Sequence, residues 1–225
     1  MICCCLIRST EIKGKKRGSL CVNIGEMAGR ARGSKETAGW RSSGDEREKM
    51  NLTYRNIRIR NAEVEDAALL CTWWNDGEVM AHAGFPLGLG TSEEEITRKI
   101  LMESDETTRR HIILINEKPV GEMNYRHLDE TSCEMGIKIC ERTYQDKGFG
   151  TLILHMFLQG LFTVRNCEKV LLDTNLNNTR AQHVYEKLGF RKLRVNKDSW
   201  YDQLGRPQSS VDYELRREEY VCPLT

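Results

Sequence analysis

The sequence of 225 residues is long enough for one sizeable domain with a complete hydrophobic core. Hydrophobic residues make up 39% and charged residues 30%, with a formal net charge of +1, as in an ordinary globular protein. This balanced charge does not favour a nucleic-acid partner, which needs a dominant basic surface. No apolar run approaches the roughly 20 residues that span a bilayer, so we expect no membrane partner either.

Nine cysteines are scattered along the chain, and none forms a Cys-x-x-Cys pair of the kind expected of a zinc site. Their odd number argues against a closed disulfide framework. We therefore predict a reducing, cytoplasmic location and no metal site. Cys133 and Cys140 are expected to be small residues that fill space at strand ends.

Residues 1–49 differ in character from the rest of the chain. They carry eleven Lys/Arg against six Asp/Glu, and seven of the eighteen glycines. No helical or strand period persists in them, so they cannot bury enough apolar area to offset the entropy of ordering. We predict a disordered leader or an extension upstream of a true start at Met50; a basic, cysteine-tipped anchor is the alternative. Residues 50–225 are expected to form a single domain.

The first half of this domain predicts a strand followed by two helices. Apolar and basic residues alternate over 57–60, which indicates a half-buried strand. A helix is expected at 67–74, where one face carries Ala67, Leu70, Cys71 and Trp74. After a glycine-rich loop, Ser92 and Glu95 form a capping box that opens a second helix, whose apolar side would be Ile96, Ile100 and Leu101.

Three strands are predicted next, at 111–116, 120–125 and 134–140. Lys118 and Pro119 are expected to form the first turn between them, and residues 129–132 the second. In the third strand the apolar residues lie on one face and the polar residues on the other. The apolar row is Met135, Ile137 and Ile139.

The remaining elements alternate helix and strand before a final pair of strands. A helix after residue 150 would bury Ile153, Met156, Phe157, Gly160, Leu161 and Val164. The apolar run at 170–172 predicts a strand buried on both faces. Asn177 or Asn178 can cap a last helix that Gly189 ends. With strands at 193–197 and 211–215, the order of elements predicts a mixed α/β sheet with helices on its faces.

One motif carries chemistry: Gln145-Asp146-Lys147-Gly148-Phe149-Gly150, between a strand and a helix. A helix N-terminus offers unpaired backbone N–H groups and a positive dipole end, so it binds a pyrophosphate well. The glycines let the backbone approach a ligand closely, and the Gln145 side chain can add a donor. Two spaced glycines before a helix are equally typical of a simple turn, and neither a Walker loop nor a Rossmann fingerprint is present.

The surrounding residues favour the pyrophosphate interpretation. The six-residue stretch resembles motif A of the GNAT superfamily, and residues 175–190, Asn-Leu-Asn-Asn-Thr-Arg-Ala-Gln-His-Val-Tyr-Glu-Lys-Leu-Gly-Phe, resemble its motif B. Trp73-Trp74-Asn75-Asp76 and residues 134–139 are similar to the RimJ/RimL branch. The resemblance covers about residues 54–217. It implies a GNAT-like, mostly antiparallel central sheet of about seven strands, flanked by about four helices.

The resemblance also implies roles for individual residues. The backbone of residues 137–139 would pair with the pantetheine arm of acetyl-CoA at a splay between two strands, and residues 145–150 would wrap the pyrophosphate. Asn178 would reach the pantetheine or a phosphate, or act only as a helix cap. Tyr185 would lie near the sulfur as a general acid, or be only a core aromatic. The implied acetyl-CoA ligands are Ile137, Lys138, Ile139, Gln145, Asp146, Lys147, Gly148, Phe149, Gly150, Thr151 and Asn178.

The acceptor amine needs a base, because an alkylamine with a pKa of about 10.4 is almost fully protonated at pH 7. Glu134 is the candidate, on the strand beside the expected reaction centre; the alternative is a salt-bridged strand carboxylate. Four histidines are alternatives on paper: His111, His127, His155 and His183. The last two would lie on the polar faces of helices, whereas His127 ends a strand and is harder to dismiss.

The sequence thus predicts an enzyme that transfers acetyl from acetyl-CoA to a primary amine by direct attack in a ternary complex. The RimJ/RimL resemblance favours a protein N-terminus, and a small amine stays open. Residues 74–92 and 198–209 would shape the acceptor surface, with Asp76, Glu78, Asp198 and Asp202 suited to a cationic acceptor. The alternative is an acyl-CoA sensor or scaffold without turnover. A homodimer is compatible with either function.

Overall fold

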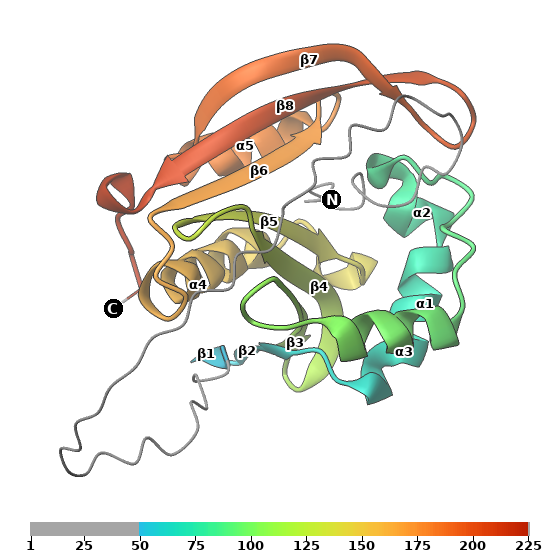
Figure 1. Cartoon of the computed structure of the whole chain (residues 1–225), viewed down its shortest axis with the longest axis horizontal. Coiled ribbons are helices and arrows are strands. Elements are labelled where there is room, and N and C mark those ends of the chain that lie inside the picture. Colours follow the sequence, from blue (N-terminus) through green and yellow to red (C-terminus); the bar gives the residue numbers. More distant parts are fainter. Residues whose placement is uncertain (1–49, 225) are drawn as a thin grey trace, which may run out of the picture.

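The computed structural model describes residues 50–224, so the predictions for residues 1–49 lie outside the described part. Eight strands form one sheet in the order β1-β2-β3-β4-β5-β6-β8-β7 (Figure 1). All neighbouring pairs are antiparallel except β5 and β6. The strands are β1 (Leu52–Tyr54), β2 (Ile57–Asn61), β3 (Thr108–Ile115), β4 (Lys118–His127), β5 (Ser132–Ile139), β6 (Lys169–Asn175), β7 (Arg191–Tyr201) and β8 (Pro207–Arg216).

Five helices flank the sheet, where about four were expected. They are α1 (Ala67–Asn75), α2 (Gly77–Met80), α3 (Glu93–Met102), α4 (Phe149–Thr163) and α5 (Thr179–Lys187). The unexpected helix is α2, a single turn that begins because the Asp76 carboxylate accepts hydrogen bonds from the N–H groups of Glu78 and Val79. None of the helices within residues 50–224 has the length and apolar character needed to cross a membrane.

The sheet buries a different hydrophobic core on each face. On one face, α4 and α5 cover a core that includes Ile57, Ile59 and the predicted row of Met135, Ile137 and Ile139. On the other, α1 and α3 pack over the alternate residues Ile112 and Leu114. Figure 1 shows the two sets of helices on opposite sides of the strands. The mixed, mostly antiparallel sheet is confirmed, with an eighth strand, β1, that is too short to show a period.

Several local predictions were wrong in detail. The first turn between strands is made by Asn116 and Glu117, with φ of 51° and 59°, while Lys118 and Pro119 lie within β4. Leu101 is 70% exposed, because Ile96 and Ile100 already bury the narrow inner side of α3. Leu171 is half-buried, so β6 is not buried on both faces at that residue.

The predicted capping box is only half made. Ser92 caps α3 by accepting from the N–H of Glu95, at 3.2 Å. The Glu95 carboxylate does not return the bond to Ser92, because it accepts from the Thr91 hydroxyl at 2.8 Å. At the other end of the domain, Asn178 is the cap of α5 and Gly189, with φ of 94°, ends it as predicted.

Candidate active site

A wedge opens between β5 and β6. The two strands pair in parallel only where residues 132–134 face residues 169–171. Beyond Glu134, β5 stays paired with β4 as far as Ile139, whereas β6 continues along β8. Within residues 50–224, the backbone edge of residues 135–139 that faces β6 therefore takes no β6 partner, which is the geometry that the predicted splay requires.

The glycine loop and α5 enclose a pocket of about 100 Å³ beside this wedge. Gly148 is the N-cap of α4 and takes a left-handed backbone, with φ of 80°. A Cβ at that position would meet no atom within 4 Å, so a ligand can approach the helix N-terminus. The lining residues are Ile139, Tyr144, Gln145, Asp146, Gly148, Gly150, Thr151, Arg180 and Val184.

Most of the predicted pyrophosphate residues meet at this pocket, but Lys147 and Phe149 do not line it. Lys147 is exposed, and the Phe149 ring packs near Tyr144 with a centroid separation of 6.1 Å. The Gln145 side chain donates to the carbonyl of Ile139 at 2.8 Å, so one of its two amide N–H groups holds the loop against the end of β5. The second N–H remains available to a ligand.

Arg180 is a pocket residue that the sequence analysis missed. Its guanidinium, on the first turn of α5, forms an ion pair with Asp146 in the loop. The pair joins the two walls of the pocket and places a cation where phosphate oxygens would lie. Arg180 lies within the motif at residues 175–190, but that its side chain contacts the glycine loop becomes apparent only in the folded chain.

Asn178 takes the capping role that was weighed for it, and its role as an acetyl-CoA ligand stays a prediction. Its Oδ1 caps α5 by accepting from the N–H of Ala181 at 3.2 Å. The residue is 4% exposed, and its Nδ2 is buried with no hydrogen-bond partner among the described residues. Buried donors are almost always satisfied in folded proteins, so this amide is free to donate to a bound molecule.

Tyr185 lies wholly in the core. Its ring packs against Phe190 and Tyr213, with centroid separations of 5.9 Å and 5.8 Å. It is therefore the core aromatic that was considered as one alternative, and its role as an acid stays a prediction.

Glu134 points away from the apolar row of β5, as expected, and occupies the last position at which β5 pairs with β6. Its carboxylate is ion-paired with Arg126 on the neighbouring strand, at 2.6 Å, and is 20% exposed. The salt-bridged arrangement is thus real, and a role as base would have to coexist with it.

The candidate histidines other than His127 lie in three different environments. His111 is fully buried beside Tyr125 and Phe157, and this burial lowers its pKa to about 3. It is neutral at pH 7 and too weak a base to deprotonate an ammonium group. His183 is exposed on α5, and the ring of His155 lies 3.2 Å from the Tyr220 hydroxyl.

A buried ionic cluster on the opposite face of β5 was not anticipated. The Glu122 carboxylate accepts from the Trp74 indole N–H at 2.8 Å and from Lys138 Nζ at 3.1 Å, and also pairs with Arg110. Burial alone would raise the pKa of Glu122, but Lys138 and Arg110 outweigh it and lower the value to about 2. The side chain of Lys138 is thus engaged on this face. The signal for it was Glu122 in the middle of β4, between Gly121 and Met123.

The Trp-Trp-Asn-Asp phrase has a structural explanation in the same region. The Trp73 indole N–H donates to Glu141 at 3.0 Å, as that of Trp74 does to Glu122. The Asn75 side chain exchanges two hydrogen bonds with the backbone of Thr91, at 2.8 Å and 3.0 Å. These contacts fix α1 and the loop that follows it against β4 and β5.

The two segments expected to form the acceptor surface contact each other. The tip of the β7–β8 hairpin reaches the loop after α2 (Figure 1). There the Gln203 side chain accepts from the N–H of Leu87 and donates to the carbonyl of Gly88, both at 2.9 Å. A Cβ on Gly84 would lie 2.2 Å from the Trp200 ring, so the hairpin and the loop pack closely.

The predicted role of Cys133 as a space-filling residue was wrong. Cys133 forms a disulfide with Cys167, which lies just before β6, while Cys140 is free and buried as expected. The two cysteines are 34 residues apart, and only the parallel pairing of β5 with β6 brings them together.

Comparison with known proteins agrees with this geometry. One similar protein is the uncharacterised N-acetyltransferase p20 of Bacillus licheniformis, which is 22% identical over 76% of this chain and 98% of its own length. Another is the spermidine N(1)-acetyltransferase of Vibrio cholerae, which is 32% identical over 43% of this chain and 56% of its own length. A solved spermidine N-acetyltransferase from Vibrio cholerae, in complex with CoA and spermine, has the same fold, with a TM-score of 0.65 and 23% identity over 73% of this chain and 98% of that one.

RimL, a ribosomal L7/L12 alpha-N-protein acetyltransferase solved with coenzyme A, also shares the fold, with a TM-score of 0.65 and 14% identity over 75% of this chain and 98% of that one. The sequence model described as "Acetyltransferase (GNAT) domain" matches residues 56–191, which is more than half of the chain. The chain therefore belongs to the GNAT acetyltransferase family.

Proposed function

We propose that this protein transfers the acetyl group of acetyl-CoA to a primary amine by direct attack in a ternary complex. The observation that carries the proposal is the position of the β5–β6 wedge, which opens directly beside the pocket of the glycine loop and α5. Ile139 ends β5 and also lines the pocket. One extended molecule can therefore lie with its phosphates at the loop and its thioester in the wedge.

The residues around the wedge fit acetyl-CoA. The N-terminus of α4 and the open space at Gly148 suit the pyrophosphate, and Arg180 supplies a cation beside it. The backbone of residues 137–139 would bind the pantetheine amides and the acetyl carbonyl. The unsatisfied Nδ2 of Asn178 is a further donor for the same molecule.

The chemistry is one acyl transfer. The neutral amine nitrogen forms a bond to the acetyl carbon, the C–S bond breaks, and CoA leaves as a thiolate. Glu134 takes a proton from the acceptor ammonium, directly or through water, and passes it to solvent. The Tyr185 hydroxyl gives a proton to the departing sulfur, and the resulting tyrosinate takes the second proton that the attacking nitrogen must lose, which leaves a neutral amide and free CoA thiol. Glu122 is the less suitable base, because a carboxyl group with a pKa of about 2 holds a proton too weakly.

The acceptor is either a protein N-terminus or a small amine. Two similar proteins represent the two classes: one is a spermidine N(1)-acetyltransferase, and RimL is an acetyltransferase of a ribosomal protein. The expected acidic surface weakens the case for a polycation, because three of its four carboxylates have partners within the protein. Asp76 caps α2, Glu78 pairs with Arg142, and Asp202 accepts from N–H groups of its own turn.

The alternative is a sensor or scaffold that binds acyl-CoA without turnover. Two observations favour it: the complete burial of Tyr185 and the engagement of Glu134 by Arg126. Both residues would have to act from positions in which they also have structural contacts.

A thiol-release assay separates the two. The full chain is mixed with acetyl-CoA and a panel of spermidine, peptides with free N-termini, aminoglycosides and amino acids, and CoA release is followed with a thiol reagent. We expect release that depends on one acceptor class and is lost when its amine is blocked by prior acetylation. Tight CoA binding in a calorimeter, with no acceptor-dependent release across the panel, would establish the sensor instead.

A further inference from the structure

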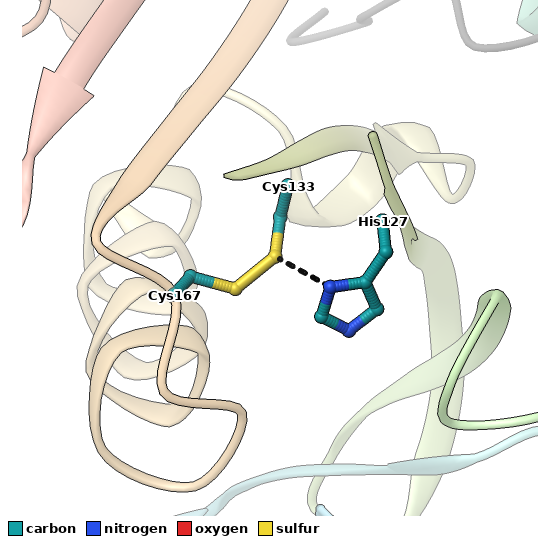
Figure 2. A group of neighbouring side chains, drawn as sticks. All are labelled: His127, Cys133 and Cys167. Atoms are coloured by element: carbon teal, nitrogen blue, oxygen red, sulfur yellow. Dashed lines mark hydrogen bonds between the residues drawn. A yellow bond between two sulfur atoms is a disulfide. The ribbon is translucent and has the colours of Figure 1, made fainter. Parts of the chain in front are cut away.

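Three potential metal ligands from three separate segments converge at the base of the wedge. Cys133 is the second residue of β5, Cys167 lies in the turn between α4 and β6, and the His127 ring extends from the end of β4 (Figure 2). The Nδ1 atom of His127 lies 3.6 Å from the sulfur of Cys133, and the three ligand atoms all lie within 4.8 Å of one another. In the structure the two sulfurs are joined as a disulfide.

The disulfide alone does not account for the imidazole. A disulfide needs no third group, and its sulfurs are at most weak acceptors, so a ring nitrogen directed at one of them gains little. A histidine and two thiolates, by contrast, are a common ligand set for zinc(II). Soft thiolate ligands also select zinc over the hard cations magnesium and calcium.

We propose that His127, Cys133 and Cys167 bind one zinc ion when the disulfide is reduced. Tetrahedral zinc with bonds of about 2.3 Å to sulfur and about 2.0 Å to nitrogen holds these two atoms about 3.6 Å apart. This is the separation already present between His127 and Cys133. The three ligand atoms already lie within 4.8 Å of one another, and the two sulfurs must move apart to the somewhat longer spacing of two thiolates on one ion.

The surroundings of the three residues suit a cation. Both cysteines are fully buried, whereas His127 is half-buried and lines a pocket of about 640 Å³. Water from that pocket can fill the fourth position, as it does where zinc has three protein ligands. The same pocket is lined by Asp105, Glu106, Asp129 and Glu130; it also holds Arg165, whose guanidinium lies 3.4 Å from Asp105.

The disulfide and the zinc site are alternative states of the same sulfurs. A dithiol reductant donates two electrons and two protons, becomes a disulfide itself and leaves Cys133 and Cys167 as thiols. Zinc then displaces the two thiol protons. The ion would link β4, β5 and the start of β6 at the point where the wedge begins, so it would fix the same junction that the disulfide fixes.

Cobalt(II) and zinc(II) titrations of the full chain test the proposal. The protein is reduced with excess dithiol and a chelator, then freed of both without oxygen. We expect the visible d–d absorption of tetrahedral cobalt and a thiolate-to-cobalt charge-transfer band, both lost when one equivalent of zinc is added. Cys167→Ser should take up one equivalent less than the wild type. Cys140→Ser, which removes a buried free thiol from the residue directly after β5, should bind as the wild type does. Any metal bound by cysteines outside the described residues contributes equally in every variant, so it does not affect this comparison.

His127→Ala decides whether the imidazole is a ligand, and it leaves both thiols and the apolar core in place. Loss of an outer partner of a ligand already costs about 10- to 100-fold in affinity, so we expect more than a 100-fold weaker zinc affinity. An unchanged affinity in this variant overturns the proposal. Equal metal uptake by Cys167→Ser and Cys140→Ser also overturns it. So does a fully reduced wild-type protein that gives no cobalt spectrum, because Cys133 and Cys167 would then serve only as a disulfide. Circular dichroism confirms folding, and if Cys167→Ser does not fold, the His127→Ala result stands by itself.

Discussion

Gly148 is the residue at which backbone conformation and ligand access coincide. It takes a left-handed backbone at the start of α4, and the space beyond its Cα is open. A valine there would strain the backbone by about 1–2 kcal/mol and place its side chain at the mouth of the pocket. Gly148→Val is therefore expected to raise the Kd for acetyl-CoA at least about 10-fold in calorimetry, equivalent to about 1.4 kcal/mol.

Gly205 provides the matched control for this substitution. Its φ is 73° and a Cβ there also meets no atom within 4 Å, but it lies in the turn between β7 and β8. Gly205→Val should cause similar strain and leave the Kd unchanged. Equal Kd values for the two variants would show that the glycine loop is not part of the acetyl-CoA site.

Tyr185 can be tested against a tyrosine that shares its environment. Tyr185→Phe keeps the packed ring and removes the proposed acid, so kcat should fall about 100-fold with little change in KM. Tyr213 is equally buried, contacts the Tyr185 ring and donates its hydroxyl to Glu186 at 3.0 Å. Tyr213→Phe should leave kcat near the wild-type value; similar losses in both variants would indicate a packing effect and contradict the acid role.

At the scale of elements, the Glu122 cluster attaches α1 to three neighbouring strands, β3, β4 and β5. Trp74 on α1, Glu122 on β4 and Lys138 on β5 are joined by hydrogen bonds, and Arg110 on β3 stacks over the Trp74 ring at 4.4 Å. Removing one member of a buried ionic group leaves the other charges without compensation, which typically costs about 3–5 kcal/mol. We expect a loss of this size in the unfolding free energy of Glu122→Gln at pH 7, measured with urea.

The pH dependence of that loss follows from the lowered pKa of Glu122. Because the carboxylate is favoured in the folded state, its contribution is fully present above its ordinary pKa of 4.5 and disappears as the pH falls through about 2. The difference between wild type and Glu122→Gln should therefore shrink from pH 5 to pH 2. Glu117→Gln, which affects an exposed ion pair with Arg58, should cost less than about 1 kcal/mol at any pH.

Local patterns predicted those elements whose partners are near in sequence. The alternation in residues 134–139 predicted β5, because successive side chains of a strand point to opposite faces of the sheet. The glycine loop and Asn178 were found because a helix terminus has fixed requirements for capping. Three-residue β1 and four-residue α2 were missed, because neither is long enough to show a period.

Contacts between distant segments could not be predicted in this way. The partner of Glu122 depends on the register of β4 against β5, and the partner of Cys133 depends on the parallel pairing with β6. The bond between Gln203 and Leu87 spans 116 residues. No periodicity within one element carries that information.

For the whole molecule, Met50 is the first of the described residues and already belongs to the core. Its side chain is 1% exposed and packs against Gly160 of α4, and the family match begins shortly after it. We propose that residues 1–49 add little to the domain. A chain beginning at Met50 is expected to unfold within about 2–4 °C of the full chain, a shift of at most about 1 kcal/mol, and to bind acetyl-CoA equally well. A chain that fails to fold, or binds several-fold more weakly, would show that those residues belong to the domain.

The order of the strands also bears on when the protein becomes competent during synthesis. β8 is the last strand along the described chain, yet it lies between β6 and β7. A nascent chain therefore exposes one edge of β6, a wall of the wedge, until residues 207–216 have left the ribosome. The hairpin that carries Gln203 to residues 87 and 88 is completed at the same moment. The surface expected to receive the acceptor is thus completed only by the final strand, whereas every residue that lines the glycine-loop pocket precedes β8 in the chain.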